Sequence, residues 1–175
     1  MASDRYSRLV RVYVPVTVAM LQQLVADGSM RAVNGTAFAV TPTLRESYAE
    51  GDDDELADVA LRDAALASLR LLAADDQESG LPPRRAVVVA EVDGVTARPE
   101  LDDAVVRLSG PVALDQVIAV YVDNVDAESA VRAAIEAVDA ADLGDEDSEL
   151  IVGDAQDHDL AWYAPQELPF LLELL

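Results

Sequence analysis

The sequence contains no cysteine and no lysine, and it has a single histidine. Without cysteine the chain can form no disulfide, no thiolate nucleophile and no cysteine-ligated zinc site. No apolar run approaches the roughly 20 residues that cross a bilayer. Residues 1–11 carry charge but no apolar signal core. We therefore expect a cytoplasmic protein that does not act at a membrane.

The motifs of several catalytic classes are also missing. No serine stands in a Gly-x-Ser-x-Gly pattern, and the eight glycines are scattered singly instead of forming a phosphate loop. Phosphodiesterases with two catalytic histidines are excluded because His158 is the one histidine. It lies between Asp157 and Asp159, which would suit an acid–base group, but we interpret it as a solvated loop residue. We expect no catalytic, cofactor-binding or metal-binding residue.

Basic residues are scarce and unevenly placed. Twelve arginines face 34 acidic residues, for a net charge of −22. Residues 1–45 hold five arginines against two aspartates, whereas residues 133–175 hold twelve acidic residues and no arginine. Because phosphate binding needs a basic surface, this distribution disfavours free nucleic acid and anionic membranes as partners.

Two dense acidic runs stand out within this charge. Residues 52–55 are expected to begin a helix, where carboxylates favour the positive end of the helix dipole. Residues 145–159 are expected to form a loop with at most one helical turn. Neither run alternates as a calcium-binding loop does. The second run predicts a negative protein-binding surface made of Asp145, Glu146, Asp147, Glu149, Asp154, Asp157 and Asp159.

Hydrophobic periodicity predicts the secondary structure. Residues 9–14 alternate as a strand does and end at Pro15; Thr17 then caps a helix that Gly28 ends. The pattern Tyr-x-Pro followed by regularly spaced apolar residues returns at 163–174, so we expect these two units to lie close together. Further strands are predicted at 36–41, 86–92, 105–108, 117–122 and 160–163, and further helices at 44–49, 54–73 and 127–141.

These elements predict an α+β or α/β fold in which helices pack on a mixed sheet of five or six strands. A ferredoxin-like topology is one alternative, since periodicity does not determine strand order. At 175 residues the chain is expected to form a single domain, residues 1–175. The polar, proline-containing run 75–85 predicts a mobile linker. Trp162 and Tyr163 are expected to pack in the core, although aromatic residues also anchor interfaces.

Several segments resemble a family of uncharacterised actinobacterial proteins, a domain of unknown function. They are RVYVP at 11–15, GTAFAVTP at 35–42, DLGDED at 142–147 and DHDLAWYAPQEL at 157–168. The resemblance implies a source with a GC-rich genome, which is consistent with the absence of lysine. It implies no activity, cofactor or catalytic residue.

Three functions fit these observations. The first is a non-catalytic acidic adaptor or regulator that binds a basic protein surface, which includes imitation of a nucleic acid. The second is a carboxylate- or metal-dependent enzyme, which the acidic runs alone suggest. The third is a homo-oligomer without a ligand that pairs its basic N-terminal part with its acidic C-terminal part.

Overall fold

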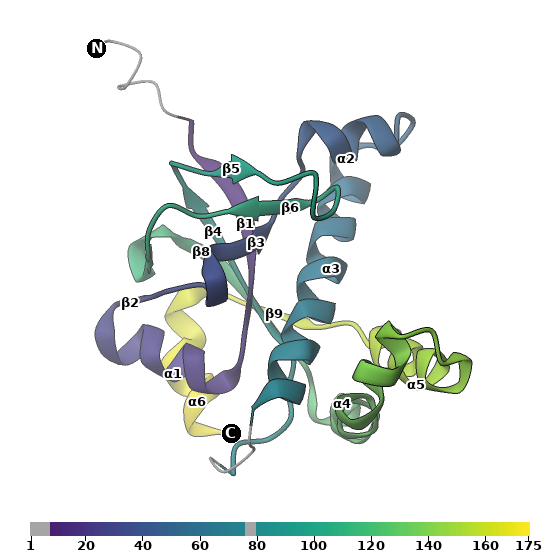
Figure 1. Ribbon diagram of the computed structural model, residues 1–175. Coiled ribbons are helices and arrows are strands. Elements are labelled where there is room, and N and C mark those ends of the chain that lie inside the picture. Colours follow the sequence, from purple (N-terminus) through teal and green to yellow (C-terminus); the bar gives the residue numbers. More distant parts are fainter. Residues whose placement is uncertain (1–7, 76–79) are drawn as a thin grey trace.

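The computed structural model describes residues 8–75 and 80–175 and has three layers. A central sheet lies between helices α1 (Val18–Asp27) and α6 (Leu168–Glu173) on one face and α3 (Asp53–Ala74), α4 (Glu128–Asp142) and α5 (Glu146–Gln156) on the other (Figure 1). The short helix α2 (Pro42–Ser47) precedes α3. The α+β class is therefore confirmed.

The sheet has seven strands, and every neighbouring pair is antiparallel. Its order is β5-β6-β3-β1-β4-β8-β9. The strands are β1 (Val10–Val16), β3 (Thr36–Phe38), β4 (Ala86–Val92), β5 (Thr96–Ala97), β6 (Val105–Arg107), β8 (Val117–Val122) and β9 (Ala161–Tyr163). The sheet is not the expected mixed sheet of five or six strands. Strand β5 pairs with β6 and adds a seventh strand. The strands that the helices connect are not parallel neighbours, so no parallel pair forms within the described residues.

One split β-α-β unit organises the centre of the sheet. Strands β3 and β4 are both antiparallel to β1, so they run parallel to each other on its two sides, and α3 lies on the connection between them. A ferredoxin-like topology interleaves two such units. Here β8 and β9 are direct antiparallel neighbours, so the ferredoxin-like order is not the one found.

Shorter elements complete the fold. A second sheet pairs β2 (Ser29–Met30) with β7 (Val112–Ala113). Single turns of 3-10 helix occur at η2 (Val33–Gly35), η3 (Leu114–Gln116), η4 (Val125–Ala127) and η5 (Pro165–Glu167). None of the helices in the described ranges is both long and apolar enough to cross a membrane.

The helices of the two similar units, α1 and α6, lie in one layer as expected, whereas their strands β1 and β9 are separated in the sheet by β4 and β8. The Thr17 hydroxyl caps α1 by accepting a hydrogen bond from the Met20 amide at 3.2 Å, and Gly28 ends it at φ 76°. Leu21 of α1 and Leu168 of α6 are fully buried in the same cluster, and the two helices are in contact. Pro169 lies in the first turn of α6, where proline is tolerated.

Helix α3 packs along the opposite face of the sheet. The Asp52 carboxylate caps it by accepting a hydrogen bond from the Glu55 amide at 2.8 Å, as expected for the first acidic run. Ala60 and Ala64 are fully buried against the sheet. Further along α3, Leu69 and Leu72 are buried against Val131 and Val138 of α4 and Ala155 of α5. Helices α4 and α5 therefore pack on α3.

Residues 146–156 of the acidic run form helix α5, whereas a loop with at most one helical turn was predicted. The Asp145 carboxylate caps α5, and Ala155 is fully buried against α3 and α4. Helix α5 also makes extensive contact with α4. The sequence of α5 shows no clear helical periodicity, because only a narrow face of this helix contacts α3 and α4. Such a helix needs few apolar residues.

Two local predictions were also wrong. Pro15 does not end β1, which continues to Val16 in register with β4. Strand β3 pairs with β1 only at Tyr13, so β1 has an open side near Pro15 where a residue without an N–H group is tolerated. Helix α2 begins at Pro42, two residues before the predicted start at residue 44, because the Thr41 hydroxyl caps it by accepting a hydrogen bond from the Leu44 amide at 3.0 Å.

The predicted linker at 75–85 is only partly within the described residues. Residues 76–79 lie outside them, so the mobility of this segment stays a prediction. At its C-terminal end Pro83 and Arg85 are buried. That end belongs to the packed structure.

We predict that Ser68→Ala destabilises the protein by about 1–3 kcal/mol, the cost of leaving buried backbone groups unbonded. The Ser68 side chain is fully buried; its hydroxyl donates to the Val16 carbonyl at 2.7 Å and accepts the Ala86 amide at 3.0 Å. It thus joins α3 to β1 and β4. Urea unfolding measures the change, and exposed Ser47→Ala is the control. Equal effects of both substitutions would contradict this role.

Candidate functional site

The seven acidic residues predicted to bind protein lie on α5 and its flanking turns. All seven are exposed, and none takes part in an ion pair within the described residues: Asp145, Glu146, Asp147, Glu149, Asp154, Asp157 and Asp159. By contrast, Asp142 at the end of α4 forms a bidentate pair with Arg70, at 2.9 and 3.0 Å. The structure therefore places the predicted residues on one helix and its ends, without compensating cations.

Some of these acids also stabilise α5. Asp145 accepts hydrogen bonds from the amide and hydroxyl of Ser148, at 2.9 and 2.6 Å, and these bonds lower the pKa of its carboxyl group. Glu146, Asp147 and Glu149 lie in the first turn, where the helix dipole favours negative charge. A test of binding should therefore leave Asp145 in place.

Exposed apolar side chains accompany the carboxylates. Leu143, in the turn between α4 and α5, is 90% exposed, and Leu150 on α5 is 69% exposed. Ile151 is also exposed. A surface of this kind offers apolar contact area as well as negative charge.

A pocket of about 410 Å³ adjoins the base of α5. One wall comes from α3, with Asp58, Leu61, Arg62 and Ala65 among its residues. Tyr121 of β8 lines the sheet side, and Gln156 at the end of α5 lines the pocket together with His158, Asp159 and Leu160, which lie between α5 and β9. Arg85, the residue before β4, also lines the pocket.

The pocket is built on a buried ion pair between Arg85 and Asp123. The two side chains are 1% and 0% exposed. The Arg85 guanidinium donates from Nε and Nη2 to the two Asp123 oxygens at 2.9 and 2.7 Å, and the Arg85 amide donates to the same carboxylate at 2.8 Å. In return, the Asp123 amide donates to the Arg85 carbonyl at 3.0 Å. The pair therefore connects the start of β4 to the end of β8.

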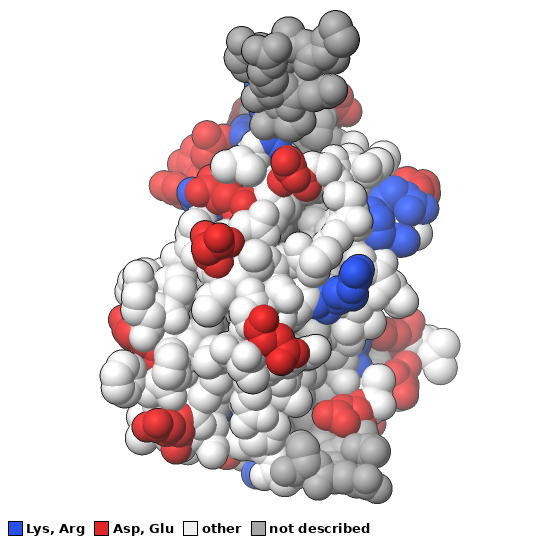
Figure 2. Space-filling view, turned by 90° about the vertical axis from the view of Figure 1, so that its left-hand side faces the viewer, with Lys and Arg blue, Asp and Glu red and all other residues white. Residues whose placement is uncertain are grey.

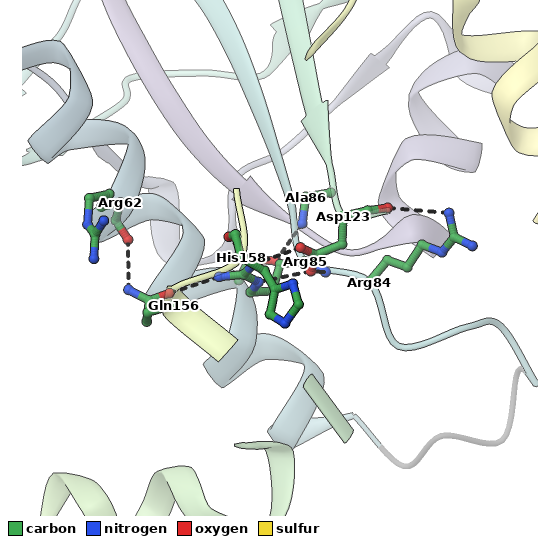
Figure 3. Close-up of polar contacts among 8 residues, drawn as sticks. Arg62, Arg84, Arg85, Ala86, Asp123, Gln156 and His158 are labelled. Atoms are coloured by element: carbon green, nitrogen blue, oxygen red, sulfur yellow. Dashed lines mark hydrogen bonds and ion pairs between the residues drawn. The ribbon is translucent and has the colours of Figure 1, made fainter. Parts of the chain in front are cut away.

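The same guanidinium holds the segment between α5 and β9 (Figure 3). Nη1 of Arg85 donates to Oε1 of Gln156 at 3.0 Å, and Nη2 donates to the backbone carbonyl of His158 at 2.8 Å. Nε2 of the Gln156 side chain donates in turn to the backbone carbonyl of Arg62 on α3, at 3.5 Å. These bonds satisfy four of the five guanidinium N–H groups, leaving one on Nη1 without a protein acceptor in the described residues.

Trp162 and Tyr163 lie on opposite faces of the sheet. Trp162 is opposite Tyr121 in the β8–β9 ladder, and such partners project to the same face, here that of α3. Tyr163 packs against the cluster beneath α1 and α6, as expected. The expectation of a core position was wrong for Trp162, which is 56% exposed because β9 is the edge strand and α3 does not cover it.

Sequence reasoning missed the central pair of this site. Arg85 was assigned to the linker, and Asp123 received no role. The signal was an arginine directly before an apolar strand and an aspartate directly after another. His158 contributes a backbone carbonyl to the network and lines the pocket, so the interpretation of it as a simple solvated residue was incomplete.

The side of the molecule facing away from α5 differs in character. Figure 2 views the protein from the side of α1 and β2, and its charged side chains are separated by broad uncharged areas. Phe170 of α6 and Leu174, directly after this helix, are exposed. On this face the acidic side chains are spaced apart, in contrast to the dense acidic run on α5.

The structure supplies no metal-binding geometry in its described part. Within residues 8–75 and 80–175, no three His, Asp or Glu side chains are grouped closely enough to hold an ion. The run 52–55 serves the start of α3, where Asp52 is the cap.

Comparison with known proteins places the chain in a family. A model of the family of unknown function (DUF6912) matches residues 10–172. The chain belongs to this family. The resemblance to an uncharacterised family is therefore confirmed, while an actinobacterial source stays a prediction. No curated protein and no solved structure matches the chain.

We predict that Asp123→Ala lowers the free energy of unfolding by about 3–5 kcal/mol, because it leaves the Arg85 charge buried without a partner. The matched control is Asp142→Ala, which breaks the half-exposed pair with Arg70 and should cost less than about 1 kcal/mol. Urea unfolding measures both values. Similar losses of unfolding free energy in the two variants would show that burial of the Arg85–Asp123 pair does not increase its effect on stability.

A second prediction concerns Asp63 on α3, outside the pocket. Burial and the nearby carboxylates of Asp102 and Asp103 raise its pKa to about 6, against the opposing effect of Arg70 and Arg62. The folded state therefore binds this proton more tightly than the unfolded state does, and stability from this group falls as the pH rises from about 4 to about 6. Asp63→Asn should raise stability at pH 7 and flatten this part of the profile. Chemical unfolding across pH 4–7 tests it, and an unchanged slope would contradict it.

Proposed function

We propose that this protein is a non-catalytic acidic adaptor or regulator that binds a basic protein surface in the cytoplasm. The binding surface is α5 with its flanking turns. The observation that carries the proposal is that seven exposed carboxylates lie there without a cation partner in the described residues. Repulsion among them favours a partner that brings positive charge.

The composition of this surface supports association. Complementary charge steers a basic partner toward α5 and raises the association rate. Leu150 and Ile151 then provide apolar contact at the centre of the acids, which charge alone would not supply. A row of carboxylates along a helix can also imitate nucleic-acid phosphates, so a DNA- or RNA-binding protein is one kind of partner that fits.

Self-association is the second candidate, and it has its own observation. Phe170 of α6 and Leu174, which follows its last residue, are 72% and 83% exposed. Two copies that met through α6 would keep their acidic helices on the outer sides. Light scattering at several protein concentrations separates this candidate from the adaptor, because the adaptor is monomeric without its partner.

We predict that neutralising part of α5 weakens binding to a defined basic probe. The variant is Glu149→Gln with Asp154→Asn and Asp157→Asn, which leaves the Asp145 cap intact. The probe is a labelled peptide of arginines separated by Gly-Ser pairs, followed by fluorescence anisotropy at about 20 mM salt. We expect at least about fivefold weaker binding, and loss of wild-type binding in high salt because the attraction is screened.

The control removes the same charge elsewhere. Glu46→Gln, Glu50→Gln and Asp93→Asn change three exposed acids away from α5. We expect this control to bind within about twofold of wild type. Equal weakening by both triple variants would mean that only the net charge attracts the peptide, and the assignment to α5 would fail.

A further inference from the structure

The pocket beside α3 is part of a longer groove. An adjoining hollow of about 180 Å³ shares Asp58, Leu61 and Tyr121 with it and extends to Asp54 and Tyr13. The groove therefore follows α3 along its contact with the sheet. Residues 158–160 border its other end, so it begins where the acidic surface of α5 ends.

Tyr13 and Tyr121 line the sheet side of this groove, and Trp162 lies outside its lining as the cross-strand partner of Tyr121. Tyr121 lines both hollows, and Trp162 stands next to it on the same face of the sheet. Tyr121 is partly buried and Trp162 is half exposed. Neighbouring aromatic rings open to solvent provide flat, electron-rich surfaces that attract cations.

Carboxylates stand on both sides of these rings. Asp58 lines the groove from α3 and Asp159 from the segment before β9, and both are exposed without an ion pair in the described part of the chain. Of the groove arginines, Arg85 is neutralised by Asp123, and Arg62 is exposed on the rim. Together with Asp54 in the adjoining hollow, the acids outnumber the free guanidinium, so the groove favours a positive occupant.

We propose that the groove binds an arginine side chain of the basic partner, between Asp58 and Asp159 and against the rings of Tyr121 and Trp162. A planar guanidinium can stack on an aromatic ring while its edge donates to carboxylates, which a lysine ammonium does less well. The alkyl part of the side chain would contact Leu61 and Leu160. This inference rests on the proposed function, since the acids of α5 would bring the basic segment to the groove.

Trp162 provides a direct readout, because it is the one tryptophan in the chain. The probe is the unlabelled Gly-Ser-spaced arginine peptide; the comparison peptide carries citrulline, which has the shape of arginine without its charge. We expect the arginine peptide to change the intensity or wavelength of Trp162 emission in a saturable way. The citrulline peptide should leave it unchanged.

Variants then separate the groove from α5. Trp162→Leu and Asp58→Asn should each weaken binding of the labelled arginine peptide by about three- to tenfold, the range expected for losing one cation–π or one charged contact. Matched controls are Phe170→Leu, an exposed aromatic residue on α6, and Asp27→Asn, an exposed acid on α1. Both should bind within about twofold of wild type. All four positions are exposed, and circular dichroism verifies the fold.

The outcomes distinguish the two proposals. If the arginine peptide binds and the α5 variant weakens it, but Trp162 emission and the groove variants show no effect, the groove inference is wrong and the proposed function stands. If no peptide binds the wild type, both fail. If inorganic phosphate, and not the arginine peptide, changes Trp162 emission, then Arg62, Arg85 and His158 form an anion site and the arginine inference is overturned. Equal responses to arginine and lysine peptides would overturn the specificity for arginine.

Discussion

The burial of one guanidinium determines how the functional side of this molecule is arranged. Arg85 and Asp123 are removed from water, and such a pair is tolerated only when its hydrogen-bonding groups are satisfied. The Asp123 carboxylate accepts hydrogen bonds from two guanidinium N–H groups, and the Gln156 side-chain oxygen and the His158 carbonyl accept one each. The hydrogen bonds of Arg85 therefore hold the end of α5 and the segment before β9 next to the start of β4.

In this arrangement the C-terminal end of α5 is packed against the protein and its N-terminal turns are exposed. Helix α5 is anchored by buried Ala155 and by Gln156, both near its C-terminal end, whereas its first turns carry exposed carboxylates. Asp145 and Ser148 stabilise the start of the helix locally. The acids can thus repel one another without unfolding the helix, which leaves their charge available to a basic partner.

Successive side chains of the edge strand β9 point to opposite faces of the sheet, so one of its two aromatic residues is packed and the other is exposed. Tyr163 packs against the core beneath α1 and α6, and Trp162 faces the opposite side, where α3 leaves the edge of the sheet uncovered. The groove itself lies between α3 and the sheet, where Tyr121 of β8 and Tyr13 of β1 line it, and residues 158–160 border one end.

The sequence alone determined the elements whose signals are local. Strand β4 and strand β8 have the predicted bounds, and Thr17, Gly28 and Asp52 act in the helix caps and ends expected of them. Only the tertiary structure decided the strand order, the antiparallel character of the sheet and the helical state of residues 146–156. The groove also depends on it, since Arg85 and Asp123 are 38 residues apart. Caps and periodicity act within a few residues, whereas a buried ion pair or an uncovered strand edge exists only once distant segments pack together.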